Sequence, residues 1–306
     1  MPDPLQELDY IDYDGANAVV VHRPVIAETP WILYVDGREL LTFMCSPVRL
    51  HALALGFLQS EGIIDGLDDI WQLKVYLDEH QVYLFFPDAG LDEHVTMPTC
   101  EEATGTIDVR LRGPMRVRPE RRVLTSGCGG GITFDDLSGD RPRIASQLQI
   151  PASRIVDLMR ELNYNASLYR ASRGVHTSAL ADATGLLVLA EDVGRHNTLD
   201  KIRGECLLAK IPTRDRILLT SGRVSSEMIT KARKMEVPVV VSRTSPTTTS
   251  VRLAQEWGMT LVGYARAPRF RIYAGAQRII FDQLPCAGSQ GNGYNEAATM
   301  YREGDS

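Results

Sequence analysis

One cysteine of this 306-residue chain stands where its thiol could do chemistry. The segment VLTSGCGGGITFDDL places Cys128 after Ser126-Gly127 and before three consecutive glycines. Glycines offer no packing and cost backbone entropy, so this run predicts an exposed, mobile loop or a close approach to another group. The thiolate is the nucleophilic form, and oriented backbone N–H groups or nearby arginines could favour it. For a lone cysteine beside glycines, an ordinary loop residue is the simpler interpretation.

Three other segments carry hydroxyls, small residues and arginines where expected parallel strands end. They are Thr220-Ser221-Gly222-Arg223, residues 242–247 and residues 264–269. In open α/β sheets, ligands bind beyond the carboxyl ends of the strands, so all three would meet at one edge. The first two run directly into expected helices and offer free backbone N–H groups to an anion. Forked donors suited to phosphate are supplied by Arg223, Arg243, Arg266 and Arg269. Taken one at a time, these loops are explained by Ser and Thr residues that cap helices and by arginines exposed to solvent. Because all three are expected at one edge of one sheet, we favour a site for an anionic ligand such as a nucleotide.

The histidines give a weaker signal. His176 in VHTSALAD and His196 in EDVGRHNTLDK could act as acid–base groups or metal ligands, but an isolated histidine is more often a hydrogen-bonding residue. A zinc deaminase would carry His-x-Glu followed by Pro-Cys-x-x-Cys. His176 is followed by Thr177 and Ser178, and Cys-x-x-Cys does not occur in the sequence. The sequence therefore predicts no metal site.

Composition and charge narrow the class of protein. The chain has 33 Lys and Arg against 39 Asp and Glu, and its net charge of -6 gives no general attraction to nucleic acid or anionic lipid. The N-terminus lacks the basic start and apolar stretch of a signal peptide, and no apolar run reaches the length of a membrane span. The cysteines stand in separate segments, which argues against a disulfide framework and for a reducing compartment; they are Cys45, Cys100, Cys128, Cys206 and Cys286. We expect a cytoplasmic protein without nucleic-acid or membrane partners.

Residues 1–122 predict a small α+β N-terminal domain. WILYV and ELLTFM flank Asp36-Gly37, which suits the tight turn of a hairpin. Ser46-Pro47 is expected to cap and open a helix through LHALALGFLQSEG that ends at Gly62. WQLKVYL and QVYLFF predict a second hairpin around Asp78-Glu79. The basic segment 110–122, RLRGPMRVRPERR, is interpreted as the passage between domains.

Residues 123–282 predict a larger α/β domain. It has an expected helix at SRIVDLMRELNYN, a hairpin formed by HTSALAD and LLVLAED, and a helix containing Cys206 as a core residue. From Asp215 to Ala265, strand and helix patterns alternate at a spacing typical of parallel strands with crossovers, and FRIYAG adds a last strand. The tail 283–306 lacks an apolar period and is expected to be disordered.

Several long motifs extend over most of the chain. They are MCSP at 44–47, LALGFLQSEGII at 53–64, LTSGCGGG at 124–131, HTSALAD at 176–182, EDVGRHNTLDKIRGECL at 191–207, LLTSGRVSSEMITKA at 218–232, VPVVVSRTSPTT at 237–248 and GMTLVGYARAPRFRIYAG at 258–275. In these motifs the chain resembles the formate dehydrogenase accessory sulfurtransferase family, FdhD. The resemblance covers nearly everything between Glu28 and Gly275.

The resemblance implies a fold, an activity and partners. The larger domain would resemble the cytidine deaminase fold, a mixed sheet with flanking helices, without its zinc, and the protein would be a homodimer. Members of the family act as sulfurtransferases: they take persulfide sulfur from a cysteine desulfurase. They pass it to the molybdenum bis(molybdopterin guanine dinucleotide) cofactor, which then enters the formate dehydrogenase apoenzyme. The cofactor would be bound cargo, and we expect no tightly bound metal of the protein's own.

The same resemblance assigns site residues. The persulfide cysteine falls on Cys128, and a cofactor-contacting segment falls on Tyr264, Ala265, Arg266, Ala267, Pro268 and Arg269, one of the three loops chosen from topology. We expect phosphate contacts from Arg223, Arg243 and Arg269. Hydroxyl or backbone donors would come from Ser221, Gly222 and Thr244, and His196 could assist.

One departure from the family pattern leaves two functions open. The family usually shows Cys-x-x-Cys in the thiol loop, whereas this chain has Cys128-Gly129-Gly130-Gly131. A loop with one thiol can hold a persulfide but cannot relay sulfur to a neighbouring cysteine or close a local disulfide. The chain is therefore either a sulfur carrier that needs one thiol or a cofactor-binding chaperone or insertion factor without sulfur transfer. An unrelated nucleotide-binding enzyme would explain the three loops at one sheet edge but not the loop that contains Cys128.

Overall fold

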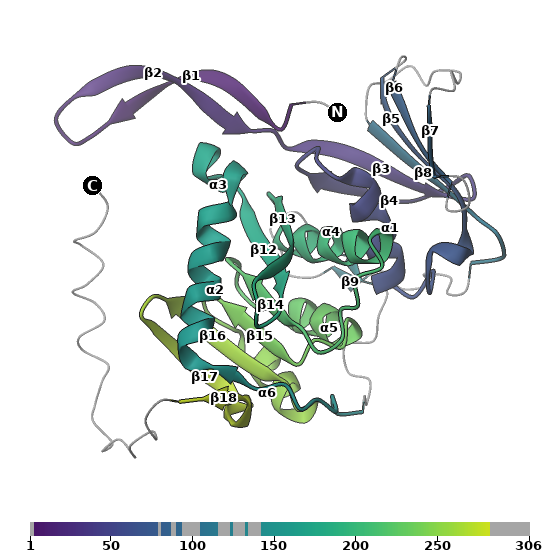
Figure 1. Cartoon of the computed structure of the whole chain (residues 1–306). Coiled ribbons are helices and arrows are strands. Elements are labelled where there is room, and N and C mark those ends of the chain that lie inside the picture. Colours follow the sequence, from purple (N-terminus) through teal and green to yellow (C-terminus); the bar gives the residue numbers. More distant parts are fainter. Residues whose placement is uncertain are drawn as a thin grey trace.

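The computed structural model describes residues 3–78, 81–86, 90–93, 105–115, 123–124, 132–133 and 142–281 (Figure 1). In these ranges the chain forms two six-stranded sheets with flanking helices and a separate two-stranded ribbon. Helices α1 (Leu50–Ser60) and α4 (Arg195–Leu208) pack against each other between the two sheets. None of the helices in the described ranges is long and apolar enough to cross a membrane.

The first sheet has the strand order β4-β3-β8-β5-β6-β7. Its strands are β3 (Thr29–Val35), β4 (Arg38–Cys45), β5 (Ile70–Asp78), β6 (Gln81–Phe86), β7 (Gly90–Glu93) and β8 (Gly105–Leu111). Both predicted hairpins are confirmed, and Asp36 and Gly37 have φ values of 50° and 77° in the turn between β3 and β4. The central strand β8, parallel to β3 and antiparallel to β5, was not predicted. Arg110 and Leu111, expected in a passage between domains, belong to it.

The start of α1 differs from the prediction. The helix begins at Leu50 after Arg49, whose φ of 53° is left-handed, and no side chain caps it. Ser46 lies three residues before the N-cap position, and its hydroxyl accepts the Val193 N–H at 3.2 Å instead. The predicted end is confirmed, since α1 stops at Ser60 and Gly62 follows with φ 73°.

The second sheet has the order β13-β12-β14-β15-β16-β17. Its strands are β12 (His176–Ala181), β13 (Leu186–Asp192), β14 (Ile217–Thr220), β15 (Val239–Ser242), β16 (Thr260–Arg266) and β17 (Arg269–Ala274). The central β14, β15 and β16 are parallel and are linked by α5 (Ser226–Lys234) and α6 (Thr248–Glu256), which confirms the predicted alternation. Apolar residues of α2 (Ala152–Asn165) bury one face of the sheet, and those of α4, α5 and α6 bury the other.

The remaining elements are short or stand apart. The short ones are η1 (Leu67–Asp69), β9 (Val123–Leu124), β10 (Ile132–Thr133), β11 (Ile150–Pro151), α3 (Ser167–Ser172), η2 (Ala276–Arg278) and β18 (Ile279–Ile280). An antiparallel ribbon of β1 (Leu5–Tyr13) and β2 (Ala18–Ile26) precedes the first sheet and was not predicted. The predicted disordered tail, 283–306, lies outside the described residues.

Candidate functional site

The structure brings the three predicted loops to one edge of the second sheet. The Ser242 hydroxyl donates to the Gly222 carbonyl at 2.7 Å, and the Thr244 hydroxyl donates to the Ser221 carbonyl at 3.5 Å. The Tyr264 N–H donates to the Thr244 carbonyl at 2.9 Å. These contacts join the ends of β14, β15 and β16, as expected for parallel neighbours.

The arginines at this edge differ in exposure. Arg223, Arg266 and Arg269 are exposed, and Arg243 is half-buried. The Arg243 N–H donates to the Thr220 carbonyl at 2.9 Å, which fixes the backbone from which this side chain leaves. The edge therefore presents cationic donors to solvent, although their contact with a ligand remains a prediction.

The helices after the first two loops use their own hydroxyls as caps. Ser225 accepts the Met228 N–H at the start of α5, and Thr247 accepts the Ser250 N–H at the start of α6. The expectation that these helix starts offer free N–H groups therefore needs correction for these two amides, because an N-cap hydroxyl satisfies each of them.

The third segment is a hairpin rather than a loop after a strand. β16 continues to Arg266, the Ala267-Pro268 peptide is cis, and β17 starts at Arg269. Tyr264 has φ 50°, and the Arg271 guanidinium lies 4.5 Å from the centre of its ring. The Ala265 side chain is buried in the core, so only its backbone could face a ligand.

Sequence reasoning missed that His176 and Arg195 reach the same edge. β12 is antiparallel to β14, so its first residue lies at the end where β14 finishes, and His176 is paired in register with Asp192, just before α4 begins. A Cβ added to Gly222 would lie 3.0 Å from the Arg195 Cβ and 3.4 Å from the His176 Nδ1. Burial, and next the Arg195 charge, lower the pKa of His176. The predicted β12–β13 hairpin could have indicated this position. In an antiparallel pair the second strand ends beside the start of the first, so Asp192 and the helix after it lie next to His176.

His196 lies next to Arg195 and is buried. Its Nε2 lies 3.3 Å from the Ser225 hydroxyl and 3.4 Å from Glu227 Oε2. Burial, followed by the nearby Lys231 charge, lowers the pKa of His196 to about 2. The imidazole is therefore neutral near pH 7, and its 3.4 Å contact with Glu227 is not an ion pair at that pH.

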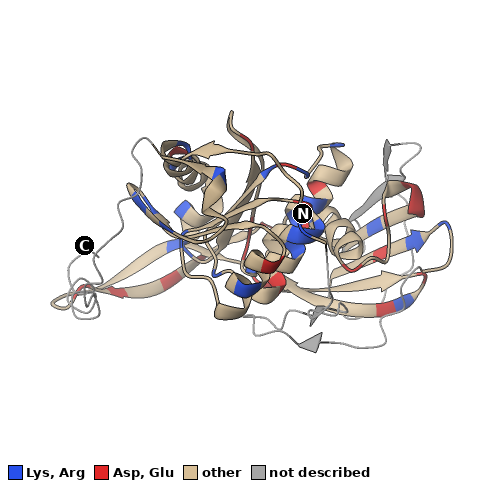
Figure 2. Cartoon of the chain, turned by 90° about the horizontal axis from the view of Figure 1, so that it is seen from below, with Lys and Arg blue, Asp and Glu red and all other residues tan. Residues whose placement is uncertain are grey.

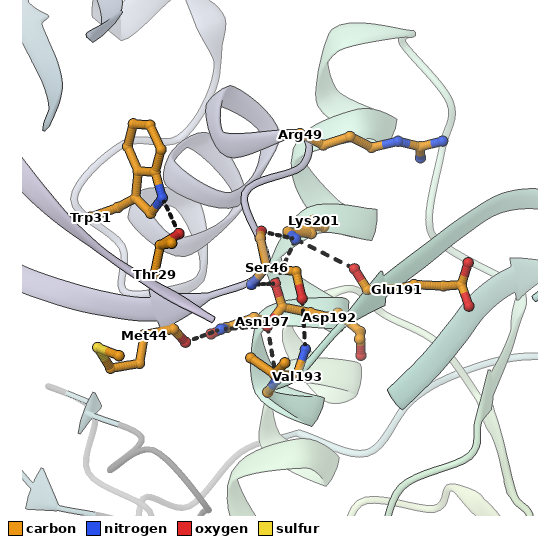
Figure 3. Close-up of polar contacts among 12 residues, drawn as sticks. Thr29, Trp31, Met44, Ser46, Arg49, Glu191, Asp192, Val193, Asn197 and Lys201 are labelled. Carbon is orange, nitrogen blue, oxygen red and sulfur yellow. Dashed lines mark hydrogen bonds and ion pairs between the residues drawn. The ribbon is translucent and has the colours of Figure 1, made fainter. Parts of the chain in front are cut away.

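Asp192 is the centre of a buried polar junction with the first sheet (Figure 3). Its Oδ2 accepts from Lys201 Nζ at 2.5 Å and from the Ser46 N–H at 3.2 Å. Its Oδ1 accepts from the Gly194 N–H at 2.8 Å and from Asn197 Nδ2 at 2.9 Å. Lys201 also donates to the Ser46 carbonyl at 3.1 Å. Since Gly194 is the N-cap of α4, this carboxylate connects the first sheet to the start of the helix that carries Arg195.

A second buried ion pair joins α4 and α5. Lys231 Nζ lies 2.5 Å from Asp200 Oδ2 and 3.9 Å from Glu227 Oε1, and the Ser60 hydroxyl of α1 donates to Asp200 Oδ1 at 3.1 Å. Burial alone would lower the pKa of Lys231, but Asp200 and Glu227 raise it above its usual value. Figure 2 shows Lys and Arg (blue) and Asp and Glu (red) on the helices in the middle of the molecule.

The predicted nucleophile Cys128 lies outside the described residues. Within the part of the chain that the structure does describe, Cys45 and Cys206 are free and buried. Burial raises the pKa of Cys45 well above its usual value and that of Cys206 to about 12. Neither is a reactive thiol, and the prediction that Cys206 is a core residue is confirmed. No group of three or more His, Cys, Asp or Glu side chains among the described residues could hold a metal ion.

Fold and site together define a mixed α/β protein whose second sheet gathers arginines, hydroxyls and small residues at one edge. The chain belongs to the FdhD/NarQ family, whose model matches residues 26–280. It is 35% identical over 261 residues to a sulfur carrier protein FdhD from Bacillus pumilus, covering 83% of this chain and 90% of that protein. A sulfur carrier protein FdhD from Wolinella succinogenes is 33% identical, with 91% and 90% covered.

A solved structure supports the fold. A putative formate dehydrogenase accessory protein from Desulfotalea psychrophila aligns with a TM-score of 0.66, covering 90% of this chain and 100% of that one. Its sequence identity is 24%, so this likeness is evidence for the fold alone.

Proposed function

We propose that this chain is a sulfur carrier that serves formate dehydrogenase. The observation that carries the proposal is membership of the FdhD/NarQ family across residues 26–280, a range that includes Cys128. The relatives named sulfur carrier protein FdhD extend over most of the chain, which agrees with a whole-protein rather than a partial resemblance.

The sulfur would arrive on Cys128. Its thiolate attacks the outer sulfur of a persulfide on a cysteine desulfurase, a new S–S bond forms at Cys128, and the desulfurase cysteine leaves as a thiolate. No net oxidation or reduction is needed in this step, because sulfane sulfur moves from one thiol to another. An unperturbed cysteine has a pKa of about 8.5, so a neighbouring cation would raise the reactive fraction.

The outer sulfur would then pass to the molybdenum bis(molybdopterin guanine dinucleotide) cofactor. Gly131 replaces the second thiol of the loop, so the attack on the inner sulfur would come from a thiol outside this loop. A mixed disulfide forms on Cys128, and the outer sulfur leaves as sulfide for the metal. Arg223, Arg243 and Arg269 would contact the phosphates of the cofactor, a role that the meeting of the three loops at one edge supports.

The proposal also covers the domain organisation, the oligomeric state and the cellular location of the protein. Residues 1–122 would form a small N-terminal domain, and residues 123–282 a larger domain that resembles the cytidine deaminase fold. The presence of two separate six-stranded sheets supports this division. The protein would act as a homodimer in the cytoplasm and deliver the cofactor to apo formate dehydrogenase.

A second candidate is a cofactor chaperone that binds the molybdenum cofactor without sulfur transfer. The feature that favours it is Gly131, because the loop has only one thiol.

Mass spectrometry separates the two candidates. The protein is incubated with a cysteine desulfurase and cysteine, and the peptide that contains Cys128 is examined for the mass gain of one sulfur atom. A sulfur carrier shows the gain, and it disappears in Cys128→Ala but not in the matched variant Cys286→Ala. No gain on this peptide, with guanosine diphosphate still bound by the wild-type protein, would favour the chaperone.

A further inference from the structure

The ribbon of β1 and β2 lacks a core of its own. Its strands pair over nine residues each, from Leu5↔Ile26 to Tyr13↔Ala18, and the ribbon extends beyond α3 away from both sheets (Figure 1). An isolated two-stranded hairpin is only marginally stable in water.

Both faces of the ribbon expose large apolar side chains. Ile11 and Val20 are paired in register on one face and are 68% and 70% exposed. Tyr10 and Val19 lie on the other face, because successive side chains of a strand alternate, and both are exposed. A ribbon that exposes apolar side chains on both faces cannot bury both faces against the body from which it projects, so we expect another surface to cover it.

An uncharged apolar stretch of the ribbon favours a permanent partner over a transient one. Two of its acids, Glu7 and Asp9, already lie 3.8 and 2.7 Å from His22 across the strands. The segment Ala18–Val21 of β2 carries no charge at all. Obligate homodimer interfaces are more apolar than those of transient complexes.

The size of the ribbon points in the same direction. Nine residues span about 30 Å and two strands about 10 Å, so the two faces together offer roughly 600 Å². One ribbon against a foreign protein would bury about 1,200 Å² in total, the lower limit for a stable interface. Two ribbons exchanged about a two-fold axis would bury about twice that area, well within the stable range.

We propose that the ribbon is an arm that docks on a second copy of this chain and that two copies exchange arms reciprocally. The arm exchange rests on the proposed homodimer and identifies the ribbon as part of the dimer interface. The arm carries neither Cys128 nor any of the residues assigned to the edge of the second sheet, so dimerisation and sulfur loading can be measured separately.

The test is the molar mass of the full chain in solution, measured by light scattering during size-exclusion chromatography. The wild-type protein is expected to be a dimer. The double variant Ile11→Lys, Val20→Glu keeps an opposite-charge pair across the strands while removing one apolar face. Its dimer should dissociate on the order of 100-fold more readily. The matched control Tyr164→Lys changes an apolar residue that is 75% exposed on α2 and should remain dimeric.

Amide hydrogen exchange tests the location of the interface. Residues 5–26 should exchange slowly in the wild-type dimer and quickly in the double variant, with the two sheets unchanged. A monomeric wild type, a dimeric double variant, or fast exchange of the ribbon in the wild-type dimer would each overturn the proposal. Loading of Cys128 by a desulfurase is recorded on the same samples, so a failure of sulfur carriage is seen independently.

Discussion

Asp192 and Lys201 form a fully buried ion pair whose loss should be costly. Replacing Lys201 with Met leaves the Asp192 carboxylate buried without its cation. Removal of one partner from a buried pair typically costs about 3–5 kcal/mol, and we expect the free energy of unfolding to fall by that amount. Urea denaturation of the full chain measures it.

Two variants control this prediction. Asp192→Asn combined with Lys201→Met should cost less than the sum of the single changes, because no charge is left unpaired. Arg252→Met breaks an exposed pair with Glu256 at 2.8 Å and should cost no more than about 1 kcal/mol. Equal losses in Lys201→Met and Arg252→Met would contradict the buried pair.

His196 should make stability depend on pH. Its pKa is about 2 in the folded chain against 6.5 for a free histidine, so the unfolded chain binds a proton first as the pH falls. The contribution of His196 is therefore fully present above pH 6.5 and is lost below it, at up to about 1.4 kcal/mol per pH unit. Urea unfolding at pH 7.5 and 5.5 should show a smaller loss in His196→Gln than in the wild type. An identical loss in both proteins would count against a buried neutral imidazole.

Residues that directly follow a predicted strand were the easier ones to place. Ser221, Gly222, Arg243 and Thr244 follow strands directly, so topology alone placed them at one edge. The Asp192–Lys201–Ser46 contacts escaped prediction because Ser46 is 146 residues from Asp192. Local sequence patterns do not show which distant polar group will contact a buried charged side chain.

Helices α1 and α4 can pack closely because each carries a glycine at the crossing. A Cβ on Gly204 would lie 2.0 Å from the Ala52 carbonyl oxygen, and one on Gly56 would lie 1.8 Å from the Asp200 carbonyl oxygen. Gly204→Ala should therefore push the helices apart and cost about 3 kcal/mol or more, despite a gain of about 1 kcal/mol in helix propensity. Thermal and urea unfolding measure the change.

Gly113→Ala is the matched control, since nothing lies within 4 Å of its added Cβ. Its stability should stay within about 0.5 kcal/mol of the wild type. A Gly204→Ala protein as stable as this control would show that the two helices are not in close backbone contact.

Elements with a clear local period were predicted well. The two early hairpins and the alternation from β14 to β16 follow from turn residues and apolar spacing. The place of β8 in the middle of the first sheet did not, because strand order depends on packing between distant segments. The ribbon was missed for another reason. Most of its residues are exposed, so its sequence does not show the alternation of buried and exposed residues that identifies a strand on a core.

At the scale of the whole molecule, the two sheets are coupled at the candidate site. Ser46, which follows the last residue of β4, contacts Asp192, and Asp192 holds the N-cap of α4. Arg195 and His196 start that helix, so the first sheet helps to fix residues at the edge of the second. The edge that would bind the cofactor is therefore held in place by residues from both sheets.

Formate oxidation in a strain that depends on this protein tests sulfur carriage most directly. The chain with Cys128→Ala should fail to restore activity although the protein accumulates normally, whereas Cys286→Ala should restore it fully. Restoration by Cys128→Ala at the level of the wild type would contradict the account, because the thiol would then have no part in the function.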